Sequence, residues 1–247
     1  MAQDNFSQVS DLYAKYRPAY PKEMYDFIFS HLSNMDKAWD CATGSGQVAS
    51  YLAGHFKEVY ANDISPQQLS YAPRKDNIKY FNVPSEDTGF MPNYFDLITV
   101  AQAVHWFDFN KFYDEVRRTA KNGALLAVFG YGQPGISDAI NILIKNFDDD
   151  TFSRYFQEQR RYVIQELKTI PFPFKEIPNN GFIHKTKWLL DDLEGFLNSW
   201  SSVQKIKTEE GYNPVDGLME KIKMYWEKGE IKEVNFPVFL RLGIIVQ

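Results

Sequence analysis

Apolar and polar positions in the first half of the chain follow two different repeats. Short runs rich in β-branched and aromatic residues predict five strands, two ending near Asp40 and Asp63 and three over residues 78–83, 95–104 and 124–131. The stretches between these runs place apolar residues three or four positions apart, as helices with one buried face require. Strands that alternate with helices favour right-handed crossovers. The pattern therefore predicts an α/β fold with a doubly wound, Rossmann-like, mostly parallel sheet.

Local chemistry indicates where several helices begin and end. The helical repeat covers residues 21–32 and 47–56. Within "ISPQQLSYA", Ser65 is the expected N-cap of a short helix. A longer helix, in the segment "FDFNKFYDEVRRTAKNG", is expected to be capped by Asp108 and closed at Gly123.

The alternation of strands and helices stops halfway along the chain. Residues 137–165 are predicted to be mainly helical, residues 169–181 irregular and proline-rich, and residues 182–190 a strand. Two helix-like segments follow. The last apolar run, residues 234–245, predicts a strand in which Pro237 favours an edge position or a bulge.

Composition narrows the class of protein. The 247 residues carry a net charge of −5 without a long basic block, which argues against broad contact with a nucleic-acid backbone. No apolar run approaches the roughly 20 residues of a membrane helix, and the amino terminus lacks a secretory signal pattern. Cys41 is the one cysteine, so no internal disulfide can form. We expect a cytoplasmic protein, a monomer or weak homodimer, without membrane or nucleic-acid partners.

The most informative segment is "WDCATGSGQVASYL", in which a glycine turn joins the first strand to a helix. A P-loop needs Lys followed by Ser or Thr after its last glycine, and this turn supplies neither. Gly44, Gly46 and Ala49 match the dinucleotide pattern G-x-G-x-x-G/A. An NAD-dependent oxidoreductase is therefore one reading of the turn.

The acidic residues around the turn favour a different ribose-bearing cofactor. S-adenosylmethionine sites commonly read Asp/Glu-x-Gly-x-Gly-x-Gly, to which Asp40, Ala42, Gly44 and Gly46 correspond. A carboxylate just ahead of the turn suits the cationic methionyl end of that cofactor, whereas it would repel a pyrophosphate. Asp63, which ends the second strand, can accept both ribose hydroxyls in either case. Ala42 stands where glycine is usual, and we expect its backbone to keep φ below zero.

Further segments resemble one enzyme family. In chain order they are YAKYRPAYP, DCATGSG, ANDISPQQLSYA, SEDTGF, AQAVHWFDFNKF, VFGYGQP and NSWSSVQ. Together they resemble class I S-adenosylmethionine-dependent methyltransferases of the methyltransferase-11 type, and among these the trans-aconitate methyltransferase-like enzymes of small-molecule metabolism. The resemblance implies one domain over residues 1–247, with a seven-stranded sheet and a reversed C-terminal hairpin. It divides the chain into an N-terminal lid segment (1–37), a cofactor-binding core (38–130) and an acceptor-side cap with the hairpin (131–247).

The resemblance also implies which residues bind the cofactor, S-adenosyl-L-methionine. They are Tyr13, Arg17, Tyr20, Asp40, Ala42, Gly44, Gly46, Asp63, Ile64, Ser85, Glu86, Gln102 and Ala103. Arg17 and the two tyrosines near it belong to a segment that folds over the cofactor. Ser85 and Glu86 would meet the adenine edge through backbone groups. Pro84 departs from the family pattern because it removes an amide donor beside them.

His105 is the candidate catalytic residue. Methyl transfer from a sulfonium is an in-line displacement, so the protein's main task is to align nucleophile, methyl and sulfur. A general base is needed only for an acceptor that is protonated at working pH. His105 follows the fourth strand at the carboxyl edge of the sheet, where ligands sit, and could act as base or orient the acceptor. The alternative is a structural histidine bonded to nearby backbone.

The acceptor side is expected to include His105, Trp106, Tyr131, Trp200 and Ser201. Simple packing is the alternative role for the aromatic members of this set. The four histidines lack metal-ligand spacing, so no metal is predicted. The expected acceptor is a small molecule, with a carboxylate favoured over a phenol or hydroxyl. A non-enzymatic ligand-binding module on the same fold is the second alternative to a methyltransferase.

Overall fold

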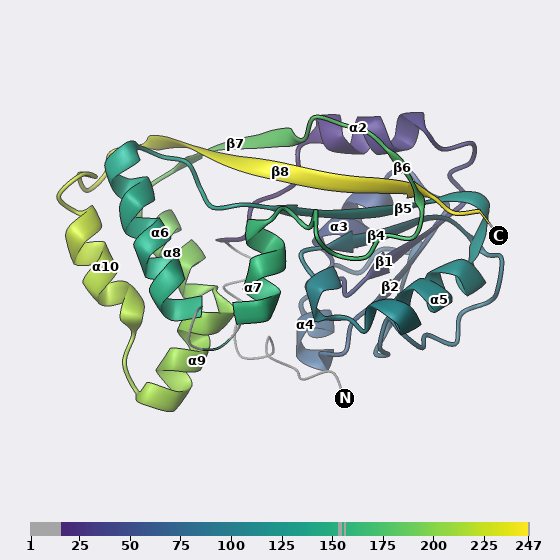
Figure 1. Ribbon diagram of the computed structural model, residues 1–247, viewed down its shortest axis with the longest axis horizontal. Coiled ribbons are helices and arrows are strands. Elements are labelled where there is room, and N and C mark those ends of the chain that lie inside the picture. Colours follow the sequence, from purple (N-terminus) through teal and green to yellow (C-terminus); the bar gives the residue numbers. More distant parts are fainter. Residues whose placement is uncertain (1–15, 153–154, 156, 247) are drawn as a thin grey trace.

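The computed structural model describes residues 16–152, 155 and 157–246 (Figure 1). Its strands are β1 (Lys37–Cys41), β2 (Glu58–Asn62), β3 (Ile78–Phe81), β4 (Phe95–Ala101), β5 (Ala120–Tyr131), β6 (Lys175–Ile177), β7 (Phe182–Trp188) and β8 (Lys232–Ile244). Its helices are α2 (Lys22–Ser30), α3 (Gln47–Leu52), α4 (Pro66–Ser70), the 3₁₀ helix η2 (Val104–Trp106), α5 (Phe109–Thr119), α6 (Asp138–Phe152), α7 (Gln157–Ile164), α8 (Leu190–Asn198), α9 (Ser201–Glu210) and α10 (Pro214–Ile222).

All these strands belong to one sheet. Its order is β3-β2-β1-β4-β5-β8-β6, and β7 also pairs with β8. Strands β1 to β5 are parallel, whereas β8 runs antiparallel to β5, β6 and β7. The predicted Rossmann-like fold, with a mostly parallel sheet and a reversed C-terminal hairpin, is confirmed.

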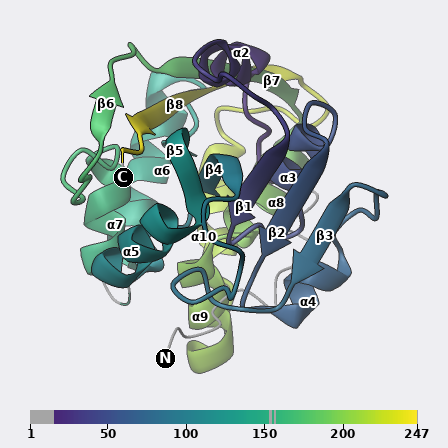
Figure 2. The same cartoon turned by 90° about the vertical axis from the view of Figure 1, so that its right-hand side faces the viewer.

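The sheet buries both of its faces. Along β5, Leu125, Ala127 and Phe129 belong to one apolar core, and Leu126 and Val128 belong to the other. Residues of α2, α3, α6, α8, α9 and α10 join the first core, and residues of η2, α5 and α7 join the second. Figure 2 shows α3 and α5 on opposite sides of the sheet. Burial on both faces explains why the parallel strands read as continuous apolar runs.

The edge beyond β8 is formed by two short strands in succession. β6 pairs with residues 242–244 of β8, and β7 pairs with residues 232–238. In the chain between them, Asn179 Nδ2 donates to the carbonyl oxygen of Leu240 at 3.1 Å. The predicted count of seven strands is therefore corrected to eight, because the chain breaks the edge strand in two.

β8 is an interior strand, which corrects the edge position predicted from Pro237. Its ladder with β5 ends at the pair Tyr131–Val238, and an isolated bridge between Gly135 and Asn235 follows. Pro237 lies in this interruption, so a residue without an N–H group occupies a place where the ladder is already broken. The irregularity corresponds to the alternative expectation of a bulge.

Helices α6, α8, α9 and α10 form a group that we call the cap. They contact one another and lie beyond the carboxyl end of β5 (Figure 1). Three helices, not the predicted two, connect β7 to β8. The additional break arises because Gly211 ends α9 in a left-handed conformation with φ 75°, and Asn213 caps α10 by accepting from Val215 N at 3.3 Å.

Ser65 and Asp108 cap their helices as the sequence predicts. Ser65 Oγ accepts from Gln68 N at 3.2 Å, and Asp108 Oδ1 accepts from Lys111 N at 3.3 Å. None of the helices in the described part of the chain combines the length and apolarity needed to cross a membrane.

Three helices end earlier than predicted, among them α2, which ends at Ser30 instead of at residue 32. α3 ends at Leu52, and α5 ends at Thr119, so the expected closure at Gly123 is wrong. Gly123 instead lies within β5, with φ 81°. The pairing of Ala120 with Phe95 of β4 draws the chain into the sheet before its helical repeat ends.

Candidate active site

The glycine turn between β1 and α3 is a tight backbone loop at the carboxyl edge of the sheet. Gly44 (φ 56°) and Gly46 (φ 77°) are left-handed, and Gly46 N donates to Thr43 O at 2.9 Å. A Cβ on Gly46 would lie 2.8 Å from Tyr80 Oη. A Cβ on Gly44 would meet only Gln68 Oε1, at 3.7 Å. Gly46 is thus required for conformation and space, whereas Gly44 leaves an open face on the turn.

Ala42 is left-handed, with φ 48°, which corrects the expectation of a negative φ. This conformation costs an L-residue about 1–2 kcal/mol. The next residue, Thr43, donates its N–H to Asn62 O on the adjacent strand at 2.9 Å. The surrounding turn therefore holds Ala42 in a backbone conformation that glycine would adopt without strain.

Asp40 is buried beneath the turn and organises it. Its Oδ2 accepts from Thr43 Oγ1 at 2.5 Å and from Ala49 N at 3.1 Å. Its Oδ1 accepts from Thr99 Oγ1 at 2.8 Å. Burial raises the pKa of Asp40 to about 6, although the three hydrogen bonds act in the opposite direction. A cation nearby would favour the ionised form of this carboxyl group.

Asp63 follows β2 and joins its end to the glycine turn. Its Oδ2 accepts from Gly44 N at 2.8 Å, and its Oδ1 accepts from Ser65 N at 2.9 Å. Each carboxylate oxygen has two lone pairs, so Asp63 can hold these amides and still accept from a pair of vicinal hydroxyls.

The segment after β3 carries Ser85 and Glu86, whose side chains are bonded within the protein. Ser85 Oγ accepts from Asn62 Nδ2 at 3.0 Å, and Glu86 Oε1 accepts from Asp108 N at 3.2 Å. Asn62 in turn accepts from Trp39 Nε1 at 2.7 Å. The side chains of Ser85 and Glu86 thus fix the segment, which is compatible with adenine contacts through backbone groups.

Gln102 and Ala103 follow β4, as expected, and Gln102 connects it to β5. Gln102 has φ 53°, and its Nε2 donates to the carbonyl oxygen of Tyr131 at 2.9 Å. Its backbone N donates to Phe129 O at 3.0 Å. A Cβ on Gly130 would lie 2.8 Å from Gln102 Oε1, so glycine at that position leaves room for the amide.

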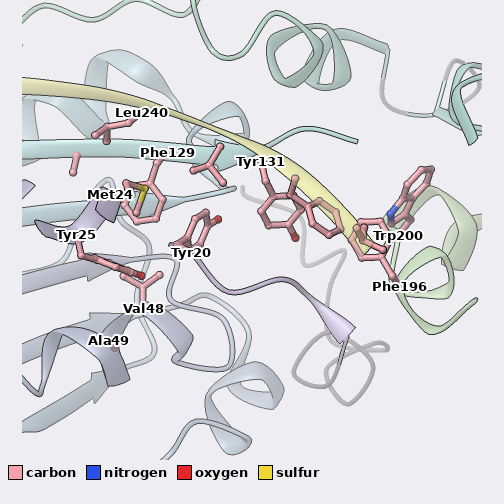
Figure 3. Packing of buried hydrophobic residues seen from close by; sticks show 14 of the residues in the cluster. Tyr20, Met24, Tyr25, Val48, Ala49, Phe129, Tyr131, Phe196, Trp200 and Leu240 are labelled. Carbon is pink, nitrogen blue, oxygen red and sulfur yellow. The ribbon is translucent and has the colours of Figure 1, made fainter. Parts of the chain in front are cut away.

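A small cavity lies above the turn. Its lining includes Asp40 from β1, Gly44 from the turn, Arg17 and Tyr20 from the chain ahead of α2, and Tyr131 from the end of β5. Arg17 Nη1 donates to Tyr131 Oη at 3.0 Å, and the rings of Tyr20 and Tyr131 have centroids 5.9 Å apart (Figure 3). The structure therefore brings predicted residues from three distant parts of the sequence to one cavity.

The cap reaches this region through the end of α8. Arg17 Nη2 donates to the carbonyl oxygen of Ser199 at 3.0 Å. Trp200 follows directly, is buried, and packs against Phe196 with ring centroids 5.9 Å apart (Figure 3). Ser201, which is half-buried, begins α9. Trp200 thus belongs to the apolar core. It follows Ser199, whose carbonyl oxygen accepts from Arg17 in the cavity wall.

His105 and Trp106 lie in η2, just after β4, and both are half-buried. Their ring centroids are 5.2 Å apart, and η2 contacts α7. Neither residue is among the described residues that line the small cavity. His105 therefore stands at the predicted edge of the sheet, separate from the Arg17–Tyr131 pair.

Two further predicted cofactor residues are Tyr13 and Ile64. Tyr13 lies outside the described residues, and Ile64 is half-buried beside Asp63. Cys41 is fully buried, which raises the pKa of its thiol well above the ordinary value and suits a packing role. Within residues 16–152, 155 and 157–246, no cluster of three or more His, Cys, Asp or Glu residues could hold a metal ion.

Sequence reasoning missed the groups that support Asp40 and the segment after β3. These are Thr43, Thr99 and Asn62. The available signal was a polar residue inside or at the end of an apolar strand, as Thr99 is in "FDLITVA". A buried polar group needs a partner, so such a residue predicts a hydrogen bond.

The groups around the turn fit the chemistry of S-adenosylmethionine. This cofactor carries an ammonium group, a carboxylate and a ribose diol. The site offers two buried carboxyl groups, Asp40 and Asp63, and the guanidinium of Arg17. A pyrophosphate would instead meet the buried acid of Asp40 without a compensating cation from the turn.

Known proteins resemble the chain over most of its length. A family model described as a methyltransferase domain matches residues 39–128, from β1 into β5. A Dictyostelium discoideum protein named as a candidate methyltransferase is 30% identical over 249 residues, covering 97% of this chain and 94% of that protein. A Saccharomyces cerevisiae protein named as a candidate S-adenosylmethionine-dependent methyltransferase is 26% identical over 225 residues, covering 76% and 77% of the two chains.

A solved structure agrees with these relatives. The structure of a candidate type II methyltransferase from Anaeromyxobacter dehalogenans has a TM-score of 0.83 at 30% identity, covering 94% of this chain and 99% of that one. The expected enzyme class and cofactor are confirmed, and the NAD-dependent and non-enzymatic alternatives are set aside. The narrower likeness to trans-aconitate methyltransferase-like enzymes stays a prediction. The chain belongs to the class I S-adenosylmethionine-dependent methyltransferases.

Proposed function

We propose that the protein transfers the methyl group of S-adenosyl-L-methionine to a small-molecule acceptor that carries a carboxylate. The observation that carries this proposal is the cavity above the glycine turn, where Asp40 and Gly44 face Arg17 and Tyr131. One guanidinium beside an apolar, aromatic wall suits a small anion. The net charge of −5 disfavours a nucleic-acid acceptor. Residues 1–247 act as one domain, as a monomer or weak homodimer.

The cofactor is held by the two acidic residues and the turn. Asp40 accepts from the methionyl ammonium group, directly or through water, and Asp63 accepts from the ribose hydroxyls. Their burial and their bonds to the turn support this assignment, because both carboxyl groups are fixed before a ligand arrives. Gly44 allows close approach, and the backbone beside Ser85 meets the adenine.

The acceptor lies at the carboxyl edge of the sheet, between η2, the end of β5 and the cap. The residues assigned to its site are His105, Trp106, Tyr131, Trp200 and Ser201. Support comes from the Arg17 guanidinium, which bonds Tyr131 Oη and Ser199 O and so links the end of β5 to the cap. Arg17 carries the permanent positive charge that a carboxylate acceptor or the cofactor's own carboxylate requires.

Alignment is the main chemical task of the chain. The bound cofactor supplies a methyl group on a positively charged sulfur. The protein orients the acceptor in line with it, and such positioning can supply on the order of 7–11 kcal/mol. A carboxylate with a pKa near 4 is already ionised at neutral pH, so His105 would only orient it. A phenol with a pKa near 10 would instead give its proton to His105.

Radiolabelled methyl transfer to pooled small acids, phenols and amines tests the proposal. We expect label in the acid pool, in a product that mild base hydrolyses to volatile methanol, because methyl esters hydrolyse whereas methyl ethers and methylamines do not. Label confined to the phenol or amine pools would contradict the carboxylate assignment. No transfer in any pool, with S-adenosylhomocysteine still bound, would contradict a small-molecule acceptor of these classes.

A further inference from the structure

The six residues ahead of α2, from Tyr16 to Pro21, form a segment that we call the strap. Tyr20 packs edge-on against Phe129 of β5, with ring centroids 4.6 Å apart. At the other end, Tyr16 and Arg17 contact α8 of the cap. Because Arg17 and Tyr20 also line the cavity above the glycine turn, the strap joins the cofactor side of the molecule to the cap.

Gly195 makes room on α8 for the ring of Tyr16. A Cβ on Gly195 would lie 2.5 Å from three carbons of that ring, closer than real Cβ contacts come. Gly195 is buried in the interior of α8, where glycine costs roughly 0.5–1 kcal/mol relative to alanine. Its helical backbone does not require glycine, so the reason for glycine here is the space that Tyr16 occupies.

Arg17 follows Tyr16 and donates hydrogen bonds both to the end of β5 and to the end of α8. Its Nη1 donates to Tyr131 Oη at 3.0 Å, and its Nη2 donates to Ser199 O at 3.0 Å. Ser199 is the C-cap of α8, so the guanidinium satisfies a carbonyl group at the negative end of the helix. Its Cζ also lies 5.6 Å from the ring centroid of Phe196. The Tyr16 ring therefore helps to hold Arg17 in place. Arg17 in turn lines the cavity and connects the end of β5 to α8.

We infer that Tyr16 and Gly195 are positioning residues that set how long the cofactor stays bound. The ring in its notch holds Arg17 between Tyr131 and Ser199, and the strap must leave this position before the cofactor is released. Cofactor retention is thereby coupled to α8 of the acceptor-side cap. The inference rests on the cofactor lying at the glycine turn, as proposed above, but not on the identity of the acceptor.

Gly195→Ala tests the notch with a single methyl group. Alanine favours the helix, so the variant closes the notch without weakening α8 itself. Gly217→Ala is the matched control, because Gly217 lies in α10 of the same cap and has no atom within 4 Å of an added Cβ. The probe is S-adenosylhomocysteine, and the measurement is its dissociation rate by stopped-flow displacement. We expect release about tenfold faster in Gly195→Ala and within about twofold of the parent in Gly217→Ala.

Tyr16→Ala provides a second variant that leaves the notch intact. We expect it to accelerate release about as much as Gly195→Ala, and the double variant to be no faster than either single one, because both remove one contact. Parental release rates in Gly195→Ala or Tyr16→Ala, or effects that multiply in the double variant, would overturn the inference. These rates need no acceptor, so a failed acceptor screen leaves the inference standing, whereas a parent that binds no S-adenosylhomocysteine would refute the proposed function itself.

Discussion

The carboxyl group of Asp40 on β1 lies 2.8 Å from the hydroxyl of Thr99 on β4, its direct partner in the register of the two strands. The same carboxyl group accepts from Thr43 Oγ1 in the glycine turn and from Ala49 N in α3. One buried acid therefore ties two strands and a loop together. Asp40 organises the turn in addition to its proposed contact with the cofactor.

This arrangement predicts that Asp40 makes stability depend on pH. Burial raises the pKa of Asp40 to about 6, above the value near 3.9 of an unfolded chain. Between these values the folded state keeps a proton that the unfolded state has released. The contribution is fully present below about pH 4 and is lost as pH rises through about 6, with a total of roughly 3 kcal/mol.

Urea unfolding of the parent and of Asp40→Asn at pH values from 4 to 7 measures this contribution. The asparagine variant cannot titrate at this position, so the difference between the two free energies of unfolding isolates Asp40. We expect the parent to lose stability relative to the variant as pH rises from 4 to 6. A difference that is constant over this range would show that the pKa of Asp40 is not raised.

Ala42→Gly should relieve strain in the turn. Glycine adopts the φ of 48° without steric cost, which is worth about 1–2 kcal/mol, and loses about 0.4–1 kcal/mol through the greater freedom of the unfolded chain. We expect a net gain of between about 0 and 1.6 kcal/mol in the free energy of unfolding. Ala53→Gly, at φ −62° after α3, is the control and should lose stability. Equal losses of unfolding free energy in Ala42→Gly and Ala53→Gly would show that the backbone of Ala42 is not strained.

His105→Gln separates the two proposed roles of this histidine. If the acceptor is a carboxylate, the variant should raise the acceptor KM by about tenfold through a weakened hydrogen bond, while the S-adenosylhomocysteine Kd stays within about twofold. The parent rate should then be flat above pH 6. His184→Gln, on strand β7, should change neither constant. A parent rate that rises with pH, and no longer does so in His105→Gln, would instead identify His105 as a general base and exclude the carboxylate.

The parallel core could be predicted from the sequence because its signals are local. Apolar runs, helix caps such as Ser65 and Asp108, and the glycine turn all lie within a few consecutive residues. The end of α5 could not be predicted from the sequence, because the pairing of Ala120 with Phe95 is a long-range contact that overrides the local helical pattern. The left-handed φ of Ala42 was missed for a similar reason, since alanine disfavours this conformation unless its surroundings impose it.

The residues of the candidate site also divide into those with a local sequence signal and those that depend on long-range contacts. Asp40, Asp63 and the glycines follow a short pattern and could be recognised from the sequence alone. The contact between Tyr16 and Gly195 joins residues far apart in the sequence and depends on how the cap docks. Thr99 became identifiable as a partner of Asp40 only when the register of β1 and β4 was known.

Calorimetric titration of S-adenosylhomocysteine into the parent, Asp63→Ala and Asp36→Ala tests the central claim most directly. Asp63 accepts from Gly44 N and is the proposed ribose ligand, whereas Asp36 forms an exposed ion pair with Lys57. We predict saturable binding to the parent and to Asp36→Ala, and affinity lower by about 2–3 kcal/mol in Asp63→Ala with an unchanged circular-dichroism spectrum. Unchanged affinity in Asp63→Ala, or saturable binding of NAD by a parent that does not bind S-adenosylhomocysteine, would contradict the account.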